Sequence, residues 1–349
     1  MKFIKGFLFF LFSGSAYAID PGLIWQTIST SHFEIHFALG NESLAWKTAD
    51  VAERVHTKLS PRLNWQPDAK THLVISDETD QPNGYALPFP FNRSVLFLAP
   101  PDNANSLEDF SDWLELLITH EYTHILHLDK ASGGARNLRD IFGRHFLLFP
   151  NMFQPGWFTE GLATHYETSS AQGIGRGQSS LFAMMMRMEV AQGIKPVSQV
   201  NLPIRSWPMG TSHYLYGVHF YEFLSEQYGD EAINALIANY SNNIIPFMIN
   251  TNTRQLFDRD VTEIWEDFAL WLQQKYQPQI QQLLQQGVVA GNRITDTGYF
   301  TSGTSIAADG TVFYIRSGAF DHSKLMMIDA QGVHHALADI HDGARIDVN

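Results

Sequence analysis

The hydrophobic pattern changes its period twice along the 349-residue chain, and these changes set the outline of the fold. From Ser31 to Phe37 apolar and polar residues alternate, which is the period of a half-buried strand. From Ser106 apolar residues recur at helical spacing for roughly 170 residues, and beyond residue 290 short alternating stretches return. We therefore expect an α+β protein with a small mixed α/β unit at residues 19–105, a mainly helical unit at 106–290 and antiparallel strands at 291–349.

The individual elements follow from local signals. In the first unit, a helix from Glu42 to about Leu59 is closed by Pro61, and strands at 71–76 and 94–99 flank a stretch rich in proline and glycine. In the helical unit, Ser106 with Asp109 forms a variant capping box, and Gly133-Gly134 ends the first helix. The helices expected in this unit span residues 107–130, 157–169, 179–192, 211–228, 230–240 and 260–284.

Net charge and cysteine content exclude several classes of function. Aspartate and glutamate number 36 against 23 lysines and arginines, a formal net charge of -13, so we expect no nucleic-acid binding, which needs a basic surface. The sequence contains no cysteine, which rules out disulfides, thiolate ligands and a cysteine nucleophile. A metal site in this chain must therefore use histidine and carboxylate side chains.

The first eighteen residues have the order of a secretory signal peptide. Lys2 and Lys5 precede an apolar stretch at residues 6–12, and Ala16-Tyr17-Ala18 matches a small-x-small cleavage signal. We expect cleavage after Ala18 and export to the periplasm or the medium. The apolar run is shorter than the roughly 18 to 20 residues that span a bilayer, so we expect no membrane span.

The segment His120-Glu121-Tyr122-Thr123-His124 matches H-E-x-x-H and falls within the first expected helix of the helical unit. The i, i+4 spacing places both imidazoles on one helix face, where they can reach one Zn²⁺ at about 2.0 to 2.1 Å. Glu121 lies about 100° round the helix, beside the metal, and can accept a proton from metal-bound water. The pattern predicts a zinc site with Glu121 as the general base.

A second segment, Trp157-Phe158-Thr159-Glu160-Gly161, lies downstream, and Glu160 follows His124 after 36 residues. Here the sequence resembles the gluzincin metallopeptidases, the thermolysin and aminopeptidase N superfamily, in which H-E-x-x-H is followed after some tens of residues by a helix carrying Glu-Gly. The resemblance implies a thermolysin-like fold with His120, His124 and Glu160 as ligands of one zinc ion. It also implies a hydrolase that cleaves peptide bonds with a metal-activated water and Glu121 as general base.

His127 competes with Glu160 for the third ligand position. Helix geometry separates His120 from His127 by about 10.5 Å along the axis, too far for three imidazoles of one straight helix to meet a single ion. We therefore interpret His127 as a packing or supporting residue. Glu167 and Thr164 share the helix face of Glu160, where they either orient ligands or form a solvated polar stripe.

The resemblance extends to Tyr214-Leu215-Tyr216-Gly217, because gluzincins of the aminopeptidase type carry a tyrosine three residues before a glycine. It implies that Tyr214 donates a hydrogen bond to the oxyanion of the reaction. Tyr216 and His213 are the alternatives in the same aromatic-rich helix.

The resemblance also implies where a peptide substrate binds. The strand Arg93–Ala99 stands where gluzincins place the edge strand that pairs with an extended peptide. The loop before it, Asn83–Pro88, lacks the Gly-x-Met-Glu-Asn signature by which aminopeptidases hold a free N-terminus. This difference argues against exopeptidase activity.

The C-terminal stretch Ser305–Ile315, with Asp309-Gly310 turning a hairpin, resembles one repeat of TolB-like β-propellers. A propeller needs at least four blades, so we expect residues 291–349 to be a partial propeller and the chain to be the front part of a longer polypeptide. Such a module can engage a protein partner. The alternative to a peptidase is therefore a periplasmic binding or assembly protein built on a metallopeptidase-like scaffold.

Overall fold

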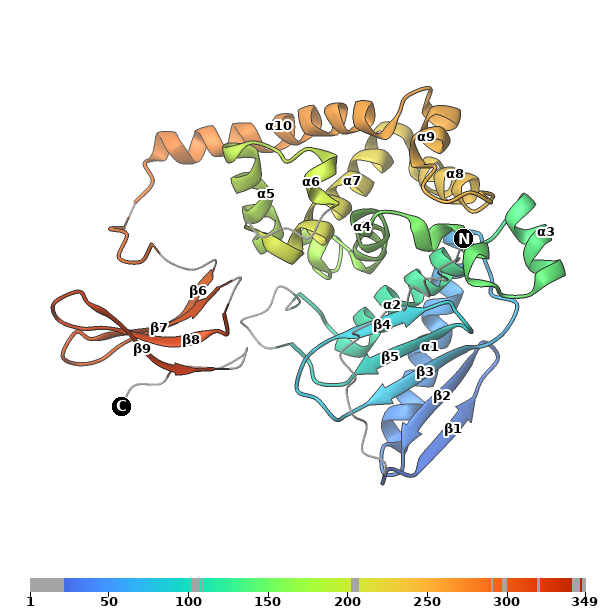
Figure 1. The fold of residues 1–349 in the computed structure, drawn as a ribbon, viewed down its shortest axis with the longest axis horizontal. Coiled ribbons are helices and arrows are strands. Elements are labelled where there is room, and N and C mark those ends of the chain that lie inside the picture. The colour runs from blue at the N-terminus through green and yellow to red at the C-terminus, as the bar shows by residue number, and fades with distance from the viewer. Residues whose placement is uncertain are drawn as a thin grey trace, which may run out of the picture.

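A computed structural model describes residues 22–101, 107, 109–201, 207–289, 291–296, 300–318, 321–340 and 346. The proposed signal peptide, residues 1–18, lies outside the described residues. The N-terminal part is a five-stranded mixed sheet with the strand order β1-β2-β3-β5-β4 (Figure 1). Strands β2, β3 and β5 run parallel, while β1 and β4 pair antiparallel at the two edges. The strands span Trp25–Ser29 (β1), Phe33–Ala38 (β2), Thr71–Ser76 (β3), Gly84–Leu87 (β4) and Arg93–Phe97 (β5).

The identity of the edge strand corrects a sequence-based expectation. The strand predicted as Arg93–Ala99 is β5, which ends at Phe97 and is paired on both sides, by β3 and by β4. The edge is β4, which lies inside the stretch expected to be a loop. The four residues of β4, Gly84–Leu87, are too few to show a period, so the turn-forming Asn83-Gly84 and Pro88 at its ends concealed it.

Two helices cover one face of this sheet: α1 (Glu42–Leu63) and α2 (Trp113–Asp129) (Figure 1). Pro61 lies in the last turn of α1 rather than after it, and the helix ends where Asn64 adopts a left-handed φ of 46°. The start of α2 differs from the expected residue 107, because the Asp112 side chain accepts hydrogen bonds from the backbone N–H groups of Leu114 and Glu115. The predicted cap, Ser106, lies outside the described residues.

The remaining helices form a second layer over α2, and all five other helices expected in this unit are present (Figure 1). They are α4 (Gly156–Glu167), α5 (Ser180–Gln192), α7 (Ser212–Tyr228), α8 (Asp230–Tyr240) and α10 (Val261–Gln286). Three more were not anticipated: α3 (Gly133–Phe142), α6 (Val197–Val200) and α9 (Ile249–Phe257). Gly133-Gly134 therefore opens α3 instead of ending α2, which stops at Asp129.

One hydrophobic core joins the sheet, α1 and α2 to the second helical layer. The C-terminal strands form a separate four-stranded antiparallel sheet, as expected, with a small cluster of its own around Tyr314, Met326 and Ile328. Its strands are β6 (Phe300–Ile306), β7 (Val312–Ser317), β8 (Lys324–Ile328) and β9 (His334–Asp339). Across the part of the chain that the structure describes, no helix is both long and apolar enough to cross a bilayer.

Candidate metal centre

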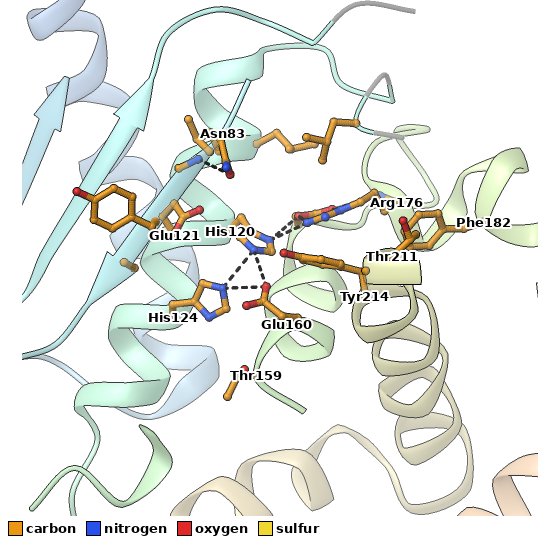
Figure 2. Close-up of a pocket in the computed structure, with 18 of the residues that line it drawn as sticks. Asn83, His120, Glu121, His124, Thr159, Glu160, Arg176, Phe182, Thr211 and Tyr214 are labelled. Carbon is orange, nitrogen blue, oxygen red and sulfur yellow. Dashed lines mark hydrogen bonds and ion pairs between the residues drawn. The ribbon is translucent and has the colours of Figure 1, made fainter. Parts of the chain in front are cut away.

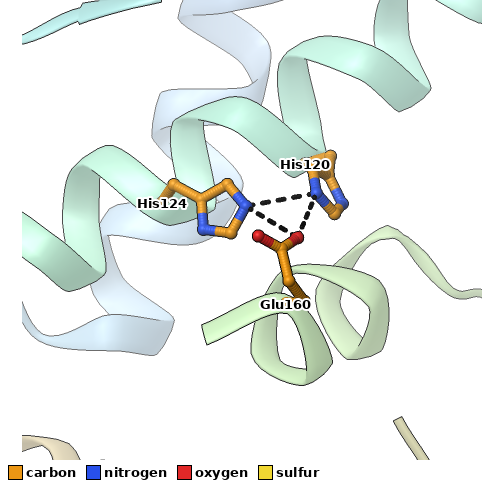
Figure 3. A group of neighbouring side chains, drawn as sticks. All are labelled: His120, His124 and Glu160. Atoms are coloured by element: carbon orange, nitrogen blue, oxygen red, sulfur yellow. Dashed lines mark hydrogen bonds and ion pairs between the residues drawn. The ribbon is translucent and has the colours of Figure 1, made fainter. Parts of the chain in front are cut away.

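His120 and His124 lie one turn apart on α2 and point to the same side, as their spacing predicts. Their Nε2 atoms are 3.2 Å apart, and each side chain is 9% exposed. Glu160 approaches from α4, with its Oε2 atom 3.4 Å from His120 Nε2 and 3.3 Å from His124 Nε2 (Figure 3). Two different helices therefore bring two imidazoles and one carboxylate together at a single point.

The distances among these three atoms fit one tetrahedral metal ion. Ligand atoms at about 2.0 to 2.1 Å from a tetrahedral Zn²⁺ lie about 3.3 to 3.4 Å from one another. The three observed separations, 3.2, 3.3 and 3.4 Å, match this value closely. Among the described residues, no other group of three histidine or acidic side chains converges in this way. Two imidazoles and one carboxylate form a donor set that suits a divalent metal ion such as zinc, and a tetrahedral ion here would keep one position for water or substrate.

His127, the competing third ligand, does not join this group. It is fully buried on the same helix and packs against Phe158, with the two ring centroids 6.3 Å apart. Burial lowers the pKa of the His127 imidazole to about 3, so the ring is neutral. The structure thus places His127 in the core.

The position of Glu160 depends on a very close crossing of α4 and α7. At this crossing Gly161 faces Gly217, and a Cβ atom added to Gly161 would lie 2.4 Å from the Gly217 Cα atom. No side chain fits between the two backbones. The pair of glycines therefore lets α4 carry Glu160 and α7 carry Tyr214 toward the same cavity.

Glu167 lies two helical turns after Glu160 on α4 and contacts the side of the His120 ring that faces away from Glu160 Oε2. Its Oε2 atom lies 2.7 Å from His120 Nδ1, and its carboxylate is gripped by Arg176 at 2.7 and 2.8 Å. Burial alone would raise the pKa of Glu167, but Arg176 and His120 hold it at about 2. Thr164 bonds the backbone carbonyl of Glu160 instead, so it does not orient the ligand carboxylate.

This arrangement selects one tautomer of His120. Nδ1 must carry the proton and donate a hydrogen bond to Glu167, because only then is Nε2 free to bind a metal. Arg176 Nη2, 3.0 Å from Nδ1, can only donate, and therefore donates its hydrogen bond to the Glu167 carboxylate. Arg176 was missed in the sequence, since a single arginine in a loop has no periodic partner that would mark it.

Glu121 lies beside the metal position, buried at 5% exposure. Its Oε2 atom has no hydrogen-bond partner among the described residues, and burial raises the pKa of its carboxyl group. The neighbouring β4 residue is Gly84, where an added Cβ atom would lie 3.0 Å from Glu121 Oε1. The glycine thus lets the edge strand approach the carboxylate directly.

Of the three candidates for an oxyanion donor, only Tyr214 lines the cavity. Figure 2 shows its hydroxyl pointing toward the group formed by His120, His124 and Glu160. Arg176 stacks on the Tyr214 ring at 4.4 Å, and burial, together with Glu160, raises the pKa of the phenol. Tyr216 bonds to Glu189 in the core, and His213 packs against Gly156.

The site opens into a cavity of about 600 Å³ between the sheet and the second helical layer (Figure 2). Asn83 and strand β4 form one wall, and the starts of α4 and α7 form the opposite one. Apolar side chains from α2 and α5 also line the cavity, namely Trp113, Leu116, Leu117 and Phe182. No protein-family model matches the sequence, and a search of the curated proteins found no significant match.

Proposed function

We propose that the protein is a zinc-dependent peptidase of the gluzincin type, with His120, His124 and Glu160 as metal ligands. One observation carries the proposal: three donor atoms at tetrahedral separations lie beside Glu121, a buried carboxylate with an unpartnered oxygen. A purely structural metal site is closed by four protein ligands and has no use for such a carboxylate. The combination favours hydrolysis.

The chemistry that a bound zinc ion supplies here is Lewis acidity toward a carbonyl oxygen and a lower pKa for water. In the proposed reaction Glu121 accepts a proton from the attacking water and returns it to the nitrogen of the leaving amine. The Tyr214 hydroxyl donates a hydrogen bond to the carbonyl oxygen as negative charge develops on it. Glu167 and Arg176 keep His120 in the tautomer and orientation that the metal requires.

Strand β4 is the proposed binding edge for the substrate backbone. One side of β4 pairs with β5. The cavity is lined by Asn83 and by the β4 residues Gly84, Tyr85 and Ala86. An extended peptide that adds to this edge by main-chain hydrogen bonds passes the metal position next to Glu121. This assigns to β4 the role that the sequence resemblance gave to Arg93–Ala99.

The test combines metal analysis with proteolysis. We expect the purified mature protein to contain one zinc ion per chain, Glu160→Ala to lose it and His127→Ala to keep it. Cleavage of an unstructured protein should stop with chelator and fall by about 10² to 10⁴-fold in Glu121→Gln, which removes the base. Equal cleavage by the untreated protein, the chelated protein and Glu121→Gln would contradict the proposal and favour a binding or assembly protein.

We further propose that the protein acts after export and that its C-terminal sheet is a TolB-like blade that engages a protein partner. The charged-apolar-small order of residues 1–18 supports export. The antiparallel order β6-β7-β8-β9 and the left-handed φ of 88° at Gly310 support a blade with an Asp-Gly hairpin.

A further inference from the structure

We propose that a row of four phenylalanines that follows on from strand β4, two of them exposed and two half-buried, is a docking site for apolar stretches of an unfolded polypeptide substrate. The inference rests on the proposed peptidase function and adds to it the class of substrate. The row, called here the phenylalanine track, consists of Phe89, Phe146, Phe153 and Phe247. Successive ring centroids along it lie 6.4, 5.3 and 5.6 Å apart.

The track is part of a larger apolar surface. Phe247 is 75% exposed and Phe146 is 43% exposed. Around them, Ile141, Phe142, Leu147, Ile244 and Ile245 are each more than half exposed. These side chains come from the end of α3, from the segment after it and from the α8–α9 loop, at the end of the molecule opposite the C-terminal sheet (Figure 1). Exposed apolar side chains concentrated in one part of a fold are typical of interaction sites.

Phe247 shows that folding alone does not explain this surface. Its φ is +64°, a left-handed conformation that is unfavourable for a bulky side chain, and most of that side chain faces solvent. Asparagine or glycine would suit the same backbone better. A strained and exposed phenylalanine gains little from packing, so its value is in contacts outside the chain.

The track continues directly from the proposed substrate edge. Phe89 follows strand β4 by two residues, and its ring meets Phe146 at one end of the track. Arg144 holds this junction together by bonding Pro90 O at 3.1 Å, Asn92 Oδ1 at 2.8 Å and Asp129 Oδ1 at 2.8 Å. A peptide paired with β4 that extends past Leu87 therefore meets the track next.

Charge indicates a polypeptide rather than a lipid surface as the occupant. The three stretches that carry the track, residues 88–92, 141–153 and 243–249, contain no aspartate or glutamate, although the chain has 36. The nearby arginines contact groups of the protein itself: Arg136 with Asp68 and Asp140, Arg139 with Leu148 O, Arg144 as described, and Arg93 over the Phe91 ring at 5.4 Å. These arginines do not form a free cationic cluster for anionic headgroups, and the phenylalanines themselves present an apolar surface that suits an apolar polypeptide segment.

The test measures binding in the Glu121→Gln background, so that no cleavage occurs. The probes are two synthetic peptides of about 20 residues, one with Phe or Leu at every third position and one with Ala at those positions. In extended form each residue adds about 3.3 Å, so a peptide of this length can reach beyond β4. Adding Phe247→Asn should weaken binding of the Phe/Leu peptide roughly tenfold and leave the Ala peptide unchanged. Trp46→Ser, which removes an aromatic side chain that is 64% exposed on α1, is the matched control and should change neither.

Two further measurements separate this role from a structural one. Phe247→Asn relieves the left-handed strain, so its thermal midpoint should equal or exceed that of the parent while its binding falls. Equal binding of the Phe/Leu peptide by both proteins overturns the proposal. So does Phe247-dependent binding to phosphatidylglycerol vesicles, or a dimer that Phe247→Asn dissociates. Absence of cleavage by the wild-type protein would overturn the proposed peptidase function. The binding measurements would still test the docking site, because they do not depend on cleavage.

Discussion

Arg176 is a buried residue that contacts both the support of His120 and the ring of Tyr214. Its guanidinium grips Glu167, which in turn holds His120, and it also stacks on the ring of Tyr214. Neither contact reaches the metal position directly. Arg176 is therefore expected to act by positioning, through both a proposed metal ligand and the proposed oxyanion donor.

We predict that Arg176→Gln weakens zinc binding by about 10 to 100-fold, because Glu167 loses the charge that keeps it ionised and oriented. The dissociation constant, measured by competition with a chromogenic chelator, is the readout. Arg139→Gln is the matched control, since Arg139 is equally buried, contacts Asp129 and stacks on Phe149 at 4.1 Å. Both variants should lose stability, but a similar loss of zinc affinity in both would show that Arg176 acts only through folding.

At the scale of elements, the crossing of α4 and α7 determines how far Glu160 stands from Tyr214. The two backbones touch at Gly161 and Gly217, so this distance is set by main-chain contact rather than by side-chain packing. The same crossing brings Trp157 of α4 against Phe220 of α7, with ring centroids 5.0 Å apart. A rigid junction of this kind holds catalytic groups more precisely than a loop does.

We predict that Gly161→Ala destabilises the protein by about 1 to 3 kcal/mol or more, because the new methyl group would overlap the backbone of Gly217. Urea unfolding monitored by tryptophan fluorescence gives the change in free energy. Gly210→Ala is the control, because among the described residues, apart from its chain neighbours, no heavy atom lies within 4 Å of the position that its Cβ would take. If Gly161→Ala has the same free energy of unfolding as the parent protein, the two backbones do not approach each other as closely as described.

At the scale of the whole molecule, buried histidines couple stability to pH. His219 is 2% exposed in α7, and its two ring nitrogens lie 2.7 Å from Leu215 O and from the Tyr276 hydroxyl. Burial lowers the pKa of His219 to about 4, although the backbone carbonyl of Leu215 opposes this. In the unfolded chain the same imidazole binds a proton near its ordinary pKa of about 6.5.

Between these two pKa values the unfolded state binds more protons, so stability falls as the pH drops from about 6.5 toward 4. For His219 alone the loss between pH 7 and pH 5 is about 2 kcal/mol. We predict that His219→Gln, which cannot titrate, is less stable at pH 7 but loses about 2 kcal/mol less on this change of pH. Urea unfolding at both pH values measures the difference, and an identical loss in the two proteins would refute the assignment.

Parts of the fold could be predicted because they depend on neighbours in sequence. The spacing of His120 and His124 places both rings on one side of any helix, and the alternation around Ile35 marks a half-buried strand in any sheet. The turn at Gly310 likewise follows from a residue that tolerates a left-handed backbone. In each case the physical cause acts over a few residues.

Other features depended on contacts between distant segments, which no local pattern records. Strand β4 lies at the edge because it joins the sheet through β5, and the start of α3 is held where the Gly134 N–H donates to Asn242 Oδ1, 108 positions away. Arg176 contacts Glu167 of α4 and Tyr214 of α7 together because these two helices cross. The spacing of His120 and His124 in the sequence thus determined that both imidazoles lie on one helix face. Tertiary packing decided which carboxylate meets them, which strand forms the edge of the sheet and which phenylalanines stay exposed. The reason is that burial and pairing are properties of the folded chain as a whole.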